Sequence, residues 1–242
     1  MRETLDLRLD NQAALIVTDI QIDFLPGGAL PVKEADQIVP VLNDYTRLFK
    51  SANAKIVISR DWHPQNHISF TMQGGPWPQH CIQNSEGAKF SPNLRVPEGA
   101  IIVSKATDPN REAYSVFDGT GLDEQLKSLV ITRVFIGGLA TDYCVVNSVL
   151  DARKMGLEVF VLADATRGIE ANPGDVDKAF ETMNQVGALQ VTMSDFPEPE
   201  DLTGIESSVE IDGDKPLGKS DVKRKARMRP KGSYKQLRRE RG

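Results

Sequence analysis

The segment GGLATDYCVV contains Cys144, one of only two cysteines in the chain, at a position where a thiol could act as a nucleophile. Cys144 follows a short apolar run, residues 134–138, and opens a helical pattern for which Thr141 is the expected N-cap. The positive end of a helix lowers the pKa of a nearby thiol, and the free N–H groups of its first turn can bind the oxyanion formed when a carbonyl is attacked. Position alone equally fits a small buried residue of the core, so a reactive role for Cys144 requires partners.

Charged residues follow two other apolar runs and could serve such a thiol. Asp19 lies just after the run 13–17, with Asp23 four residues later, and Lys105 ends the run 100–104. A carboxylate beside a thiol can accept its proton, and an ammonium group nearby stabilises the resulting anions. Each residue also has an ordinary interpretation, because aspartates after strands often cap helices and terminal lysines are often solvated.

All three histidines, His63, His67 and His80, fall in one short stretch that begins beside Asp61. In an extended chain Asp61 and His63 lie two residues apart and therefore point to the same side. Two imidazoles and a carboxylate with open coordination positions suit zinc, iron or manganese. A single histidine is more often structural, but this cluster favours a metal site. The spacing does not decide which other histidine, His67 or His80, completes the set.

The segment 60–99, which carries the histidines, is rich in Pro, Gly, Asn and Gln and is too long for a simple connection. Loops of this length in compact domains usually have a function. Three aromatic residues, Phe24, Trp77 and Tyr114, lie near the polar groups described above. They could sandwich a flat ring, although aromatic residues in loops more often only pack against their neighbours.

Short apolar runs alternate with helical patterns from residue 13 to about residue 192. The runs are continuously apolar, which is typical of strands buried on both faces. Strands separated by helices imply crossover connections, and functional sites then form beyond the carboxyl ends of the strands. We predict an α/β fold with three layers: a doubly wound, mostly parallel six-stranded sheet with helices on both faces. The expected strands are 13–17, 55–59, 100–104, 134–138, 158–163 and 188–191, and the expected helices are 35–50, 142–155 and 173–186.

The charge of the chain is unevenly distributed. Residues 1–196 carry 17 Lys/Arg and 25 Asp/Glu, residues 197–214 carry seven acids and no base, and residues 215–242 carry 12 bases and two acids. We predict one folded domain, 1–196, and a charged, disordered extension, 197–242. The acidic body argues against nucleic-acid binding by the core, which leaves only the basic tail for that role. A solvated run of charges is the simpler interpretation of the tail.

Composition and termini indicate the compartment. The chain of 242 residues is 40% hydrophobic, has no apolar run long enough to span a membrane, and begins with a polar segment unlike a secretory signal. Cys81 and Cys144 could form at most a single disulfide. These features predict a cytoplasmic protein without a membrane span.

Taken together, several segments resemble the isochorismatase-like hydrolases and, within that family, the nicotinamidases (pyrazinamidases). Their order and spacing match the family across residues 13–195, and the combination is far more specific than any single motif. The matching segments are VTDIQIDFLPGGAL, SRDWHPQNHISF, GGPWPQHC, IIVSKATDPNREAYSVFDGTGL and VFIGGLATDYCVV.

The resemblance implies roles for many of the residues named above. The implied catalytic triad is Asp19, Lys105 and Cys144. The implied ligands of one divalent metal ion, with water completing the shell, are Asp61, His63 and His80. His67 matches a position that is an additional ligand in some members. A cis peptide bond is implied before Ala140, whose N–H would form the oxyanion hole with that of Cys144. The implied substrate-binding residues are Phe24, Trp77 and Tyr114.

The resemblance also implies an activity: hydrolysis of nicotinamide, or of pyrazinamide, through a thioester on Cys144, with the metal bound to the ring nitrogen. This reaction belongs to NAD salvage. Isochorismatase itself lacks the nucleophilic cysteine, and amidases acting on ureidoacrylate or N-carbamoylsarcosine generally lack the metal-ligand set. Such a cysteine amidase of the same fold is the alternative. The resemblance is compatible with a homo-oligomer and says nothing about the tail.

Overall fold

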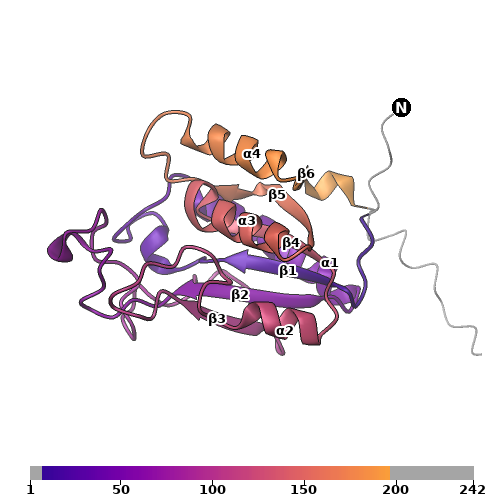
Figure 1. Ribbon diagram of the computed structural model, residues 1–242, viewed down its shortest axis with the longest axis horizontal. Coiled ribbons are helices and arrows are strands. Elements are labelled where there is room, and N and C mark those ends of the chain that lie inside the picture. The colour runs from indigo at the N-terminus through magenta and orange to yellow at the C-terminus, as the bar shows by residue number, and fades with distance from the viewer. Residues whose placement is uncertain (1–6, 197–242) are drawn as a thin grey trace, which may run out of the picture. The chain divides into compact units, whose positions relative to one another are not determined.

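The computed structural model describes residues 7–196, so the predicted extension 197–242 lies outside the described residues. Six strands form one sheet in the order β3-β2-β1-β4-β5-β6, and every neighbouring pair is parallel (Figure 1). The chain thus winds outward from β1 in both directions, which confirms the predicted fold class. The strands are β1 Ala13–Thr18, β2 Lys55–Asp61, β3 Ile101–Lys105, β4 Arg133–Leu139, β5 Glu158–Arg167 and β6 Leu189–Val191.

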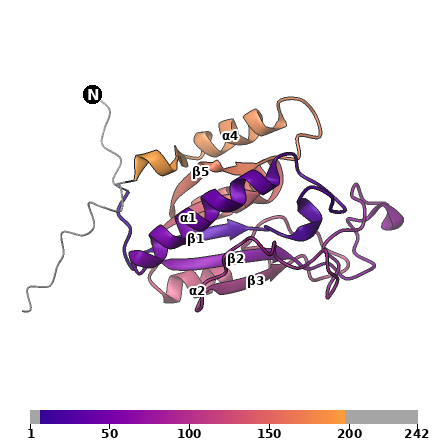
Figure 2. The ribbon, with the colours of Figure 1, turned by 180° about the vertical axis from the view of Figure 1, so that it is seen from behind.

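Helices cover both faces of the sheet (Figures 1 and 2). Because strand side chains alternate, Leu15 and Val17 of β1 pack in the core beneath α1, whereas Ala14 and Ile16 pack in the core on the opposite face. That opposite face carries the other three helices. The helices are α1 Ile38–Ser51, α2 Leu122–Ser128, α3 Val146–Lys154 and α4 Asp175–Gln185. All three predicted helices are therefore present, with ends shifted by a few residues.

Helix α2 is the element that the sequence patterns did not predict. It has seven residues and follows Gly121, whose φ angle is +71°. Only Leu122 and Leu126 are buried, and both join the core that α3 and α4 also cover. Two buried residues are too few to establish a helical period.

Strands β1 and β4 approach each other closely at their carboxyl ends because position 138 has no side chain. Gly138 has a φ angle of +115°, and a Cβ atom there would lie 2.2 Å from the carbonyl oxygen of Thr18. A glycine is therefore required. The chain that leaves β1 is brought directly beside the chain that leaves β4.

The segment 60–99 crosses the carboxyl edge of the sheet as an irregular loop (Figure 1). Beyond the end of β2, its regular structure consists of a short 3₁₀ turn, Thr71–Gln73, and isolated bridges such as His63 with Ile82 and Phe70 with Trp77. The loop predicted to be functional thus lies over the sheet edge where sites form.

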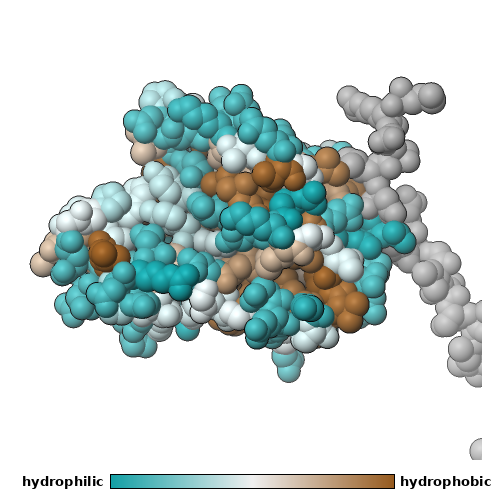
Figure 3. Space-filling model, viewed as in Figure 1, coloured by the Kyte–Doolittle hydropathy of each residue, from teal (hydrophilic) through white to brown (hydrophobic). Residues whose placement is uncertain are grey.

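The face that carries α2, α3 and α4 is largely hydrophilic, with small separate apolar patches (Figure 3). Exposed apolar side chains in the described residues include Val130 and Met155, which are 62% and 40% exposed. Within residues 7–196, no helix is both long and apolar enough to cross a membrane.

Candidate active site

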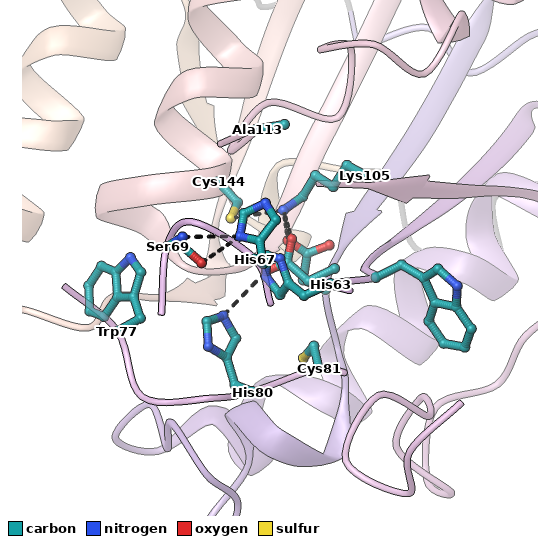
Figure 4. A network of polar contacts seen from close by, with 12 residues as sticks. His63, His67, Ser69, Trp77, His80, Cys81, Lys105, Ala113 and Cys144 are labelled. Carbon is teal, nitrogen blue, oxygen red and sulfur yellow. Dashed lines mark hydrogen bonds and ion pairs between the residues drawn. The ribbon is translucent and has the colours of Figure 1, made fainter. Parts of the chain in front are cut away.

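Four strand ends bring reactive side chains to one edge of the sheet. Asp19 follows β1, Asp61 ends β2, Lys105 ends β3, and Cys144 lies in a π-helical turn after β4. Asp61 and Lys105 are register partners across β2 and β3. The carboxyl ends of parallel strands share one edge, so the sheet itself assembles these residues. Figure 4 shows Lys105 beside Cys144, with the histidines close by.

The ammonium group of Lys105 connects the residues that we call the nucleophile cluster: Asp19, Lys105 and Cys144. Its Nζ atom is 2.9 Å from Asp19 Oδ2 and donates to Cys144 Sγ at 3.3 Å, and it also forms an ion pair with Asp61 Oδ1. Ser59 Oγ donates a hydrogen bond of 2.7 Å to Asp19 Oδ1. All five side chains are buried, so water screens these charges weakly.

Burial dominates the protonation of the nucleophile cluster. It raises the pKa of the Cys144 thiol well above its usual range; Lys105 opposes this rise, while Asp19 and Asp61 add to it. The predicted lowering of this pKa by the helix start is therefore wrong, because burial and two facing carboxylates outweigh it. Burial likewise raises the pKa of Asp19, against the opposing charge of Lys105. Burial alone would lower the pKa of Lys105, but Asp19 and Asp61 raise it well above its usual value.

The turn that carries Cys144 differs from the predicted helix start. Thr141 is not an N-cap, because the turn begins at Thr141 itself without a side-chain cap and the Thr141 hydroxyl contacts that of Thr166 at 2.7 Å. Residues Thr141–Val145 form a π-helical turn that continues into α3, and such turns are frequent at functional sites. The Leu139–Ala140 peptide bond is cis, as the resemblance implies.

A second group, the metal cluster, consists of Asp61, His63 and His80, whose ligand atoms lie within 4.8 Å of one another. Asp61 Oδ2 is 3.6 Å from His63 Nε2 and 4.0 Å from His80 Nε2. Burial would raise the pKa of Asp61, but Lys105 helps to keep it below its usual value, so Asp61 is a carboxylate. Carboxylate and imidazole donors in this number suit zinc and similar ions.

Both histidines of the metal cluster have a ring nitrogen whose lone pair is available to a metal ion. His80 Nδ1 lies 2.8 Å from the carbonyl oxygen of Pro78, so it carries the proton and leaves the Nε2 lone pair facing Asp61. Burial lowers the pKa of His80, which keeps the ring neutral. Both ring nitrogens of His63 are buried and have no hydrogen-bond partner in the described part of the chain. Unpartnered buried nitrogens beside a carboxylate fit a bound metal ion.

His67 packs against His63, with ring centroids 4.4 Å apart, but its nitrogens are engaged elsewhere. Its Nε2 lies 3.0 Å from the carbonyl oxygen of Arg111 and therefore carries the proton. Its Nδ1 then accepts a hydrogen bond from Ser69 Oγ at 2.7 Å (Figure 4). Because both ring nitrogens are engaged, His67 has no free lone pair for a metal in this arrangement.

Cys144 and all three members of the metal cluster line one hollow, which Phe24, Trp77 and Tyr114 also help to line. Trp77 Nε1 donates a hydrogen bond of 3.0 Å to Tyr114 Oη, so these two rings form a joined wall. Sequence reasoning missed four residues that also line it: Leu30, Glu112, Tyr143 and Ile169. Of these, Tyr143 carried a signal, since it directly precedes Cys144; its ring lies 5.0 Å from that of Trp77.

Asp23, the other carboxylate after β1, does not join the nucleophile cluster. Its Oδ2 accepts a hydrogen bond of 2.7 Å from the backbone N–H of Cys81 instead. Cys81 and Cys144 are both free thiols.

Known proteins are similar to this chain over most of its length. The chain matches the Isochorismatase domain over residues 13–195. It is 38% identical over 206 residues to the nicotinamidase of Escherichia coli (strain K12), which covers 76% of this chain and 97% of that protein. The pyrazinamidase of Pyrococcus horikoshii in complex with zinc is 52% identical, with a TM-score of 0.72 over 75% of this chain and 99% of that one. PnC1 from L. infantum in complex with nicotinate is 32% identical, with a TM-score of 0.73 over 79% of this chain and 98% of that one. The chain therefore belongs to the family of proteins with an isochorismatase domain.

Proposed function

We propose that this chain is a nicotinamidase, which hydrolyses the carboxamide of nicotinamide to nicotinate and ammonia and also accepts pyrazinamide. The observation that carries the proposal is that Cys144 and the metal cluster line one hollow, with Lys105 contacting both Cys144 and Asp61 behind it. A thiol with a neighbouring base attacks carbonyl carbon, and a separate metal-ligand set can hold a ring. The nicotinamidase and pyrazinamidase relatives support the same substrate class.

The first half of the reaction forms a thioester. Asp19 takes the proton of the Cys144 thiol as the sulfur attacks the carboxamide carbon. Burial raises the pKa of Asp19 and so makes it a stronger base, whereas the raised pKa of Cys144 opposes the transfer and the charge of Lys105 favours it. Lys105 stabilises the resulting anions through its contacts with both residues. The N–H groups of Ala140 and Cys144 receive the oxyanion, and one good donor lowers such a barrier by about 3 kcal/mol. Ammonia then leaves with the proton that Asp19 held.

The second half releases the acid. A water molecule attacks the thioester carbon while Asp19 accepts one of its protons. The carbon–sulfur bond breaks, and the sulfur regains a proton from Asp19. The products are the original thiol and nicotinic acid, which releases its proton to solvent as nicotinate, so the enzyme is ready for another cycle.

The metal cluster supplies positioning. Asp61, His63 and His80 would hold one divalent ion, with zinc, iron and manganese the candidates, and its chemistry when bound is to accept the lone pair of the pyridine nitrogen. The chain's own aromatic residues act on the ring: Phe24, Trp77 and Tyr114 confine it so that the carboxamide faces Cys144. Orientation of this kind accounts for a large share of many enzymatic accelerations.

Ammonia release from nicotinamide tests the proposal directly. We expect turnover of nicotinamide and pyrazinamide that falls on chelation of metal and returns when zinc is added. Ureidoacrylate and N-carbamoylsarcosine are assayed as substrates in the same way, to test the alternative that the chain is another cysteine amidase of the same fold. Turnover of either one without turnover of nicotinamide would replace the proposed substrate and leave the nucleophile cluster in its role.

We predict that the protein is cytoplasmic, and the function is compatible with a homo-oligomer. We also predict that the tail, residues 197–242, is not needed for hydrolysis. The charge run of residues 215–242 motivates this last prediction. Truncation after Phe196 is expected to leave the kinetics unchanged. Loss of polyanion binding in the truncated chain, at a fixed salt concentration, would give the tail a role of its own.

A further inference from the structure

The turn that follows β1 contacts both segments that carry the metal cluster. It consists of Gln21 and the 3₁₀ turn Ile22–Phe24. The side chain of Gln21 lies against the end of β2, and that of Asp23 lies against the loop beside His80. Neither Gln21 nor Asp23 lines the hollow, so any part they have in the site acts through the residues that they hold.

Gln21 is fully buried and binds the main chain of Asp61 at two points. Its Oε1 accepts the Asp61 N–H at 2.7 Å, and its Nε2 donates to the Asp61 carbonyl at 2.8 Å and to the Ala88 carbonyl at 2.9 Å. On its other side Asp61 is the register partner of Lys105. Strand β1 has already ended at Thr18, so the amide of Gln21 occupies the place of a strand neighbour for Asp61.

Asp23 binds the loop at the residue that follows His80. Its Oδ2 accepts the Cys81 N–H at 2.7 Å, and the Cys81 carbonyl accepts the His63 N–H at 3.0 Å. Cys81 has a φ angle of +47°, a left-handed conformation that is uncommon for residues with a side chain. The Asp23 carboxylate thus holds Cys81, which is next to His80 in the chain and is itself hydrogen-bonded to the backbone of His63.

Gly87 makes room for the Asp23 carboxylate. A Cβ atom at position 87 would lie 2.1 Å from Asp23 Oδ2 and 2.2 Å from Asp23 Oδ1. The Asp23 N–H also donates to the Gly87 carbonyl at 3.0 Å. A larger residue at this position would push the carboxylate away from Cys81.

We propose that Gln21 and Asp23 are positioning residues of the metal site, which hold Asp61, His63 and His80 in their binding arrangement before an ion enters. Two of these ligands lie on a long loop, and ordering loop residues during binding would cost conformational entropy. Partners outside the ligand set typically change metal affinity by about 10–100-fold. The inference rests on the metal site of the proposed function and is independent of the substrate.

Zinc affinity of the full chain, measured after metal removal by competition with a chromophoric chelator, tests the inference without recourse to activity. We expect Gln21→Met and Asp23→Ala each to weaken zinc binding by about 10–100-fold. Gly87→Ala should weaken it in the same direction, because it displaces the same carboxylate. Asp23→Asn keeps an oxygen acceptor for the Cys81 N–H and is expected to retain most of the affinity.

Asn43 offers a matched control outside the site. Its Nδ2 donates to the Asn93 carbonyl at 2.9 Å and its Oδ1 accepts the Arg95 N–H at 2.8 Å, so it is also an amide that binds the backbone at two points. Asn43→Ala should lower the unfolding temperature and leave zinc affinity unchanged.

Zinc binding as tight as in the unaltered chain, with only the unfolding temperature lowered, would overturn the inference and make Gln21 and Asp23 purely structural. Should Gln21→Met fail to fold, the contrast between Asp23→Ala and Asp23→Asn decides, since Asp23 is only partly buried. If the unaltered chain binds none of zinc, iron and manganese, the proposed metal site and this inference are overturned together; if it binds iron or manganese instead of zinc, the same variants are compared with that ion.

Discussion

The nucleophile cluster, through Cys144, and the metal cluster meet at one hollow but are built in different ways. Each member of the nucleophile cluster lies at or just beyond the end of a different strand, so the register of the sheet sets their separations. The metal cluster combines one strand end with a long loop, and its geometry depends on hydrogen bonds from the turn after β1. Lys105 contacts both partners in the first cluster, whereas both nitrogens of His63 in the second lack a hydrogen-bond partner among the described residues. In the nucleophile cluster, Lys105 thus joins the other two members through polar contacts. In the metal cluster, by contrast, the His63 nitrogens are left available to bind an ion.

The largest effect is expected from Cys144→Ala, which removes the nucleophile. Hydrolysis of nicotinamide should fall by about 10⁴-fold or more. Zinc affinity should stay unchanged, because the Cys144 side chain contacts Lys105 rather than a histidine. Ammonia release and chelator competition on the same protein would measure both. Retained hydrolysis would contradict the thioester route, and lost zinc binding would show that the two clusters are not separable.

Removal of the metal comes next. If an ion held by the metal cluster positions the ring of nicotinamide, chelation of that ion should lower kcat/KM for nicotinamide on the order of 100-fold. A loss of this size is typical of a misplaced substrate. The fold should persist, because the sheet and its two cores do not depend on the metal cluster; circular dichroism checks this. Undiminished kcat/KM in demonstrably metal-free protein would be incompatible with positioning by a metal.

The other two histidines, His67 and His80, both pack against His63 and form an internal comparison. His80→Ala removes a ligand and should weaken zinc binding by about 100-fold or more, whereas His67→Ala should change it by less than about tenfold. The second variant instead leaves Ser69 and the Arg111 carbonyl without their partner, at a cost of about 1 kcal/mol in unfolding free energy. Equal losses of zinc affinity would mean that His67 turns to become a ligand.

The smallest effect is expected from Tyr114→Phe. It removes the acceptor for Trp77 Nε1 and loosens the aromatic wall without touching either cluster. KM for nicotinamide should rise by a few fold, corresponding to about 0.5–1 kcal/mol, with kcat nearly unchanged. Steady-state kinetics separates the two constants. A tenfold loss confined to kcat would assign Tyr114 a direct part in the chemistry.

Much of the arrangement could be predicted because it follows from the sheet. Continuously apolar runs indicated buried parallel strands, and the charged residues at their ends, Asp19 and Lys105, had to meet Cys144 at one edge. What local sequence does not encode is the environment around these groups. The helix start predicted a lowered thiol pKa, but burial of Cys144 against two carboxylates raises it.

The metal cluster shows the same limit in another form. Spacing along the chain favoured neither His67 nor His80, because the outcome depends on where a long loop returns and on hydrogen bonds to Pro78 and Arg111 carbonyls. Glu112 and Tyr143 line the hollow for similar reasons of three-dimensional packing. Strand ends are thus more predictable than loop residues.

Gly138 has a consequence for the interpretation of mutational scans. Any side chain there would collide with the end of β1 and move Asp19 relative to Cys144. A saturation scan scored by ammonia release would rank position 138 with the reactive residues, even though glycine contributes no functional group. Sensitivity to substitution at position 138 would then reflect the close approach of β1 and β4. Only a spectroscopic or alkylation measurement of the Cys144 thiol would distinguish a residue that sets this spacing from one that takes part in the reaction.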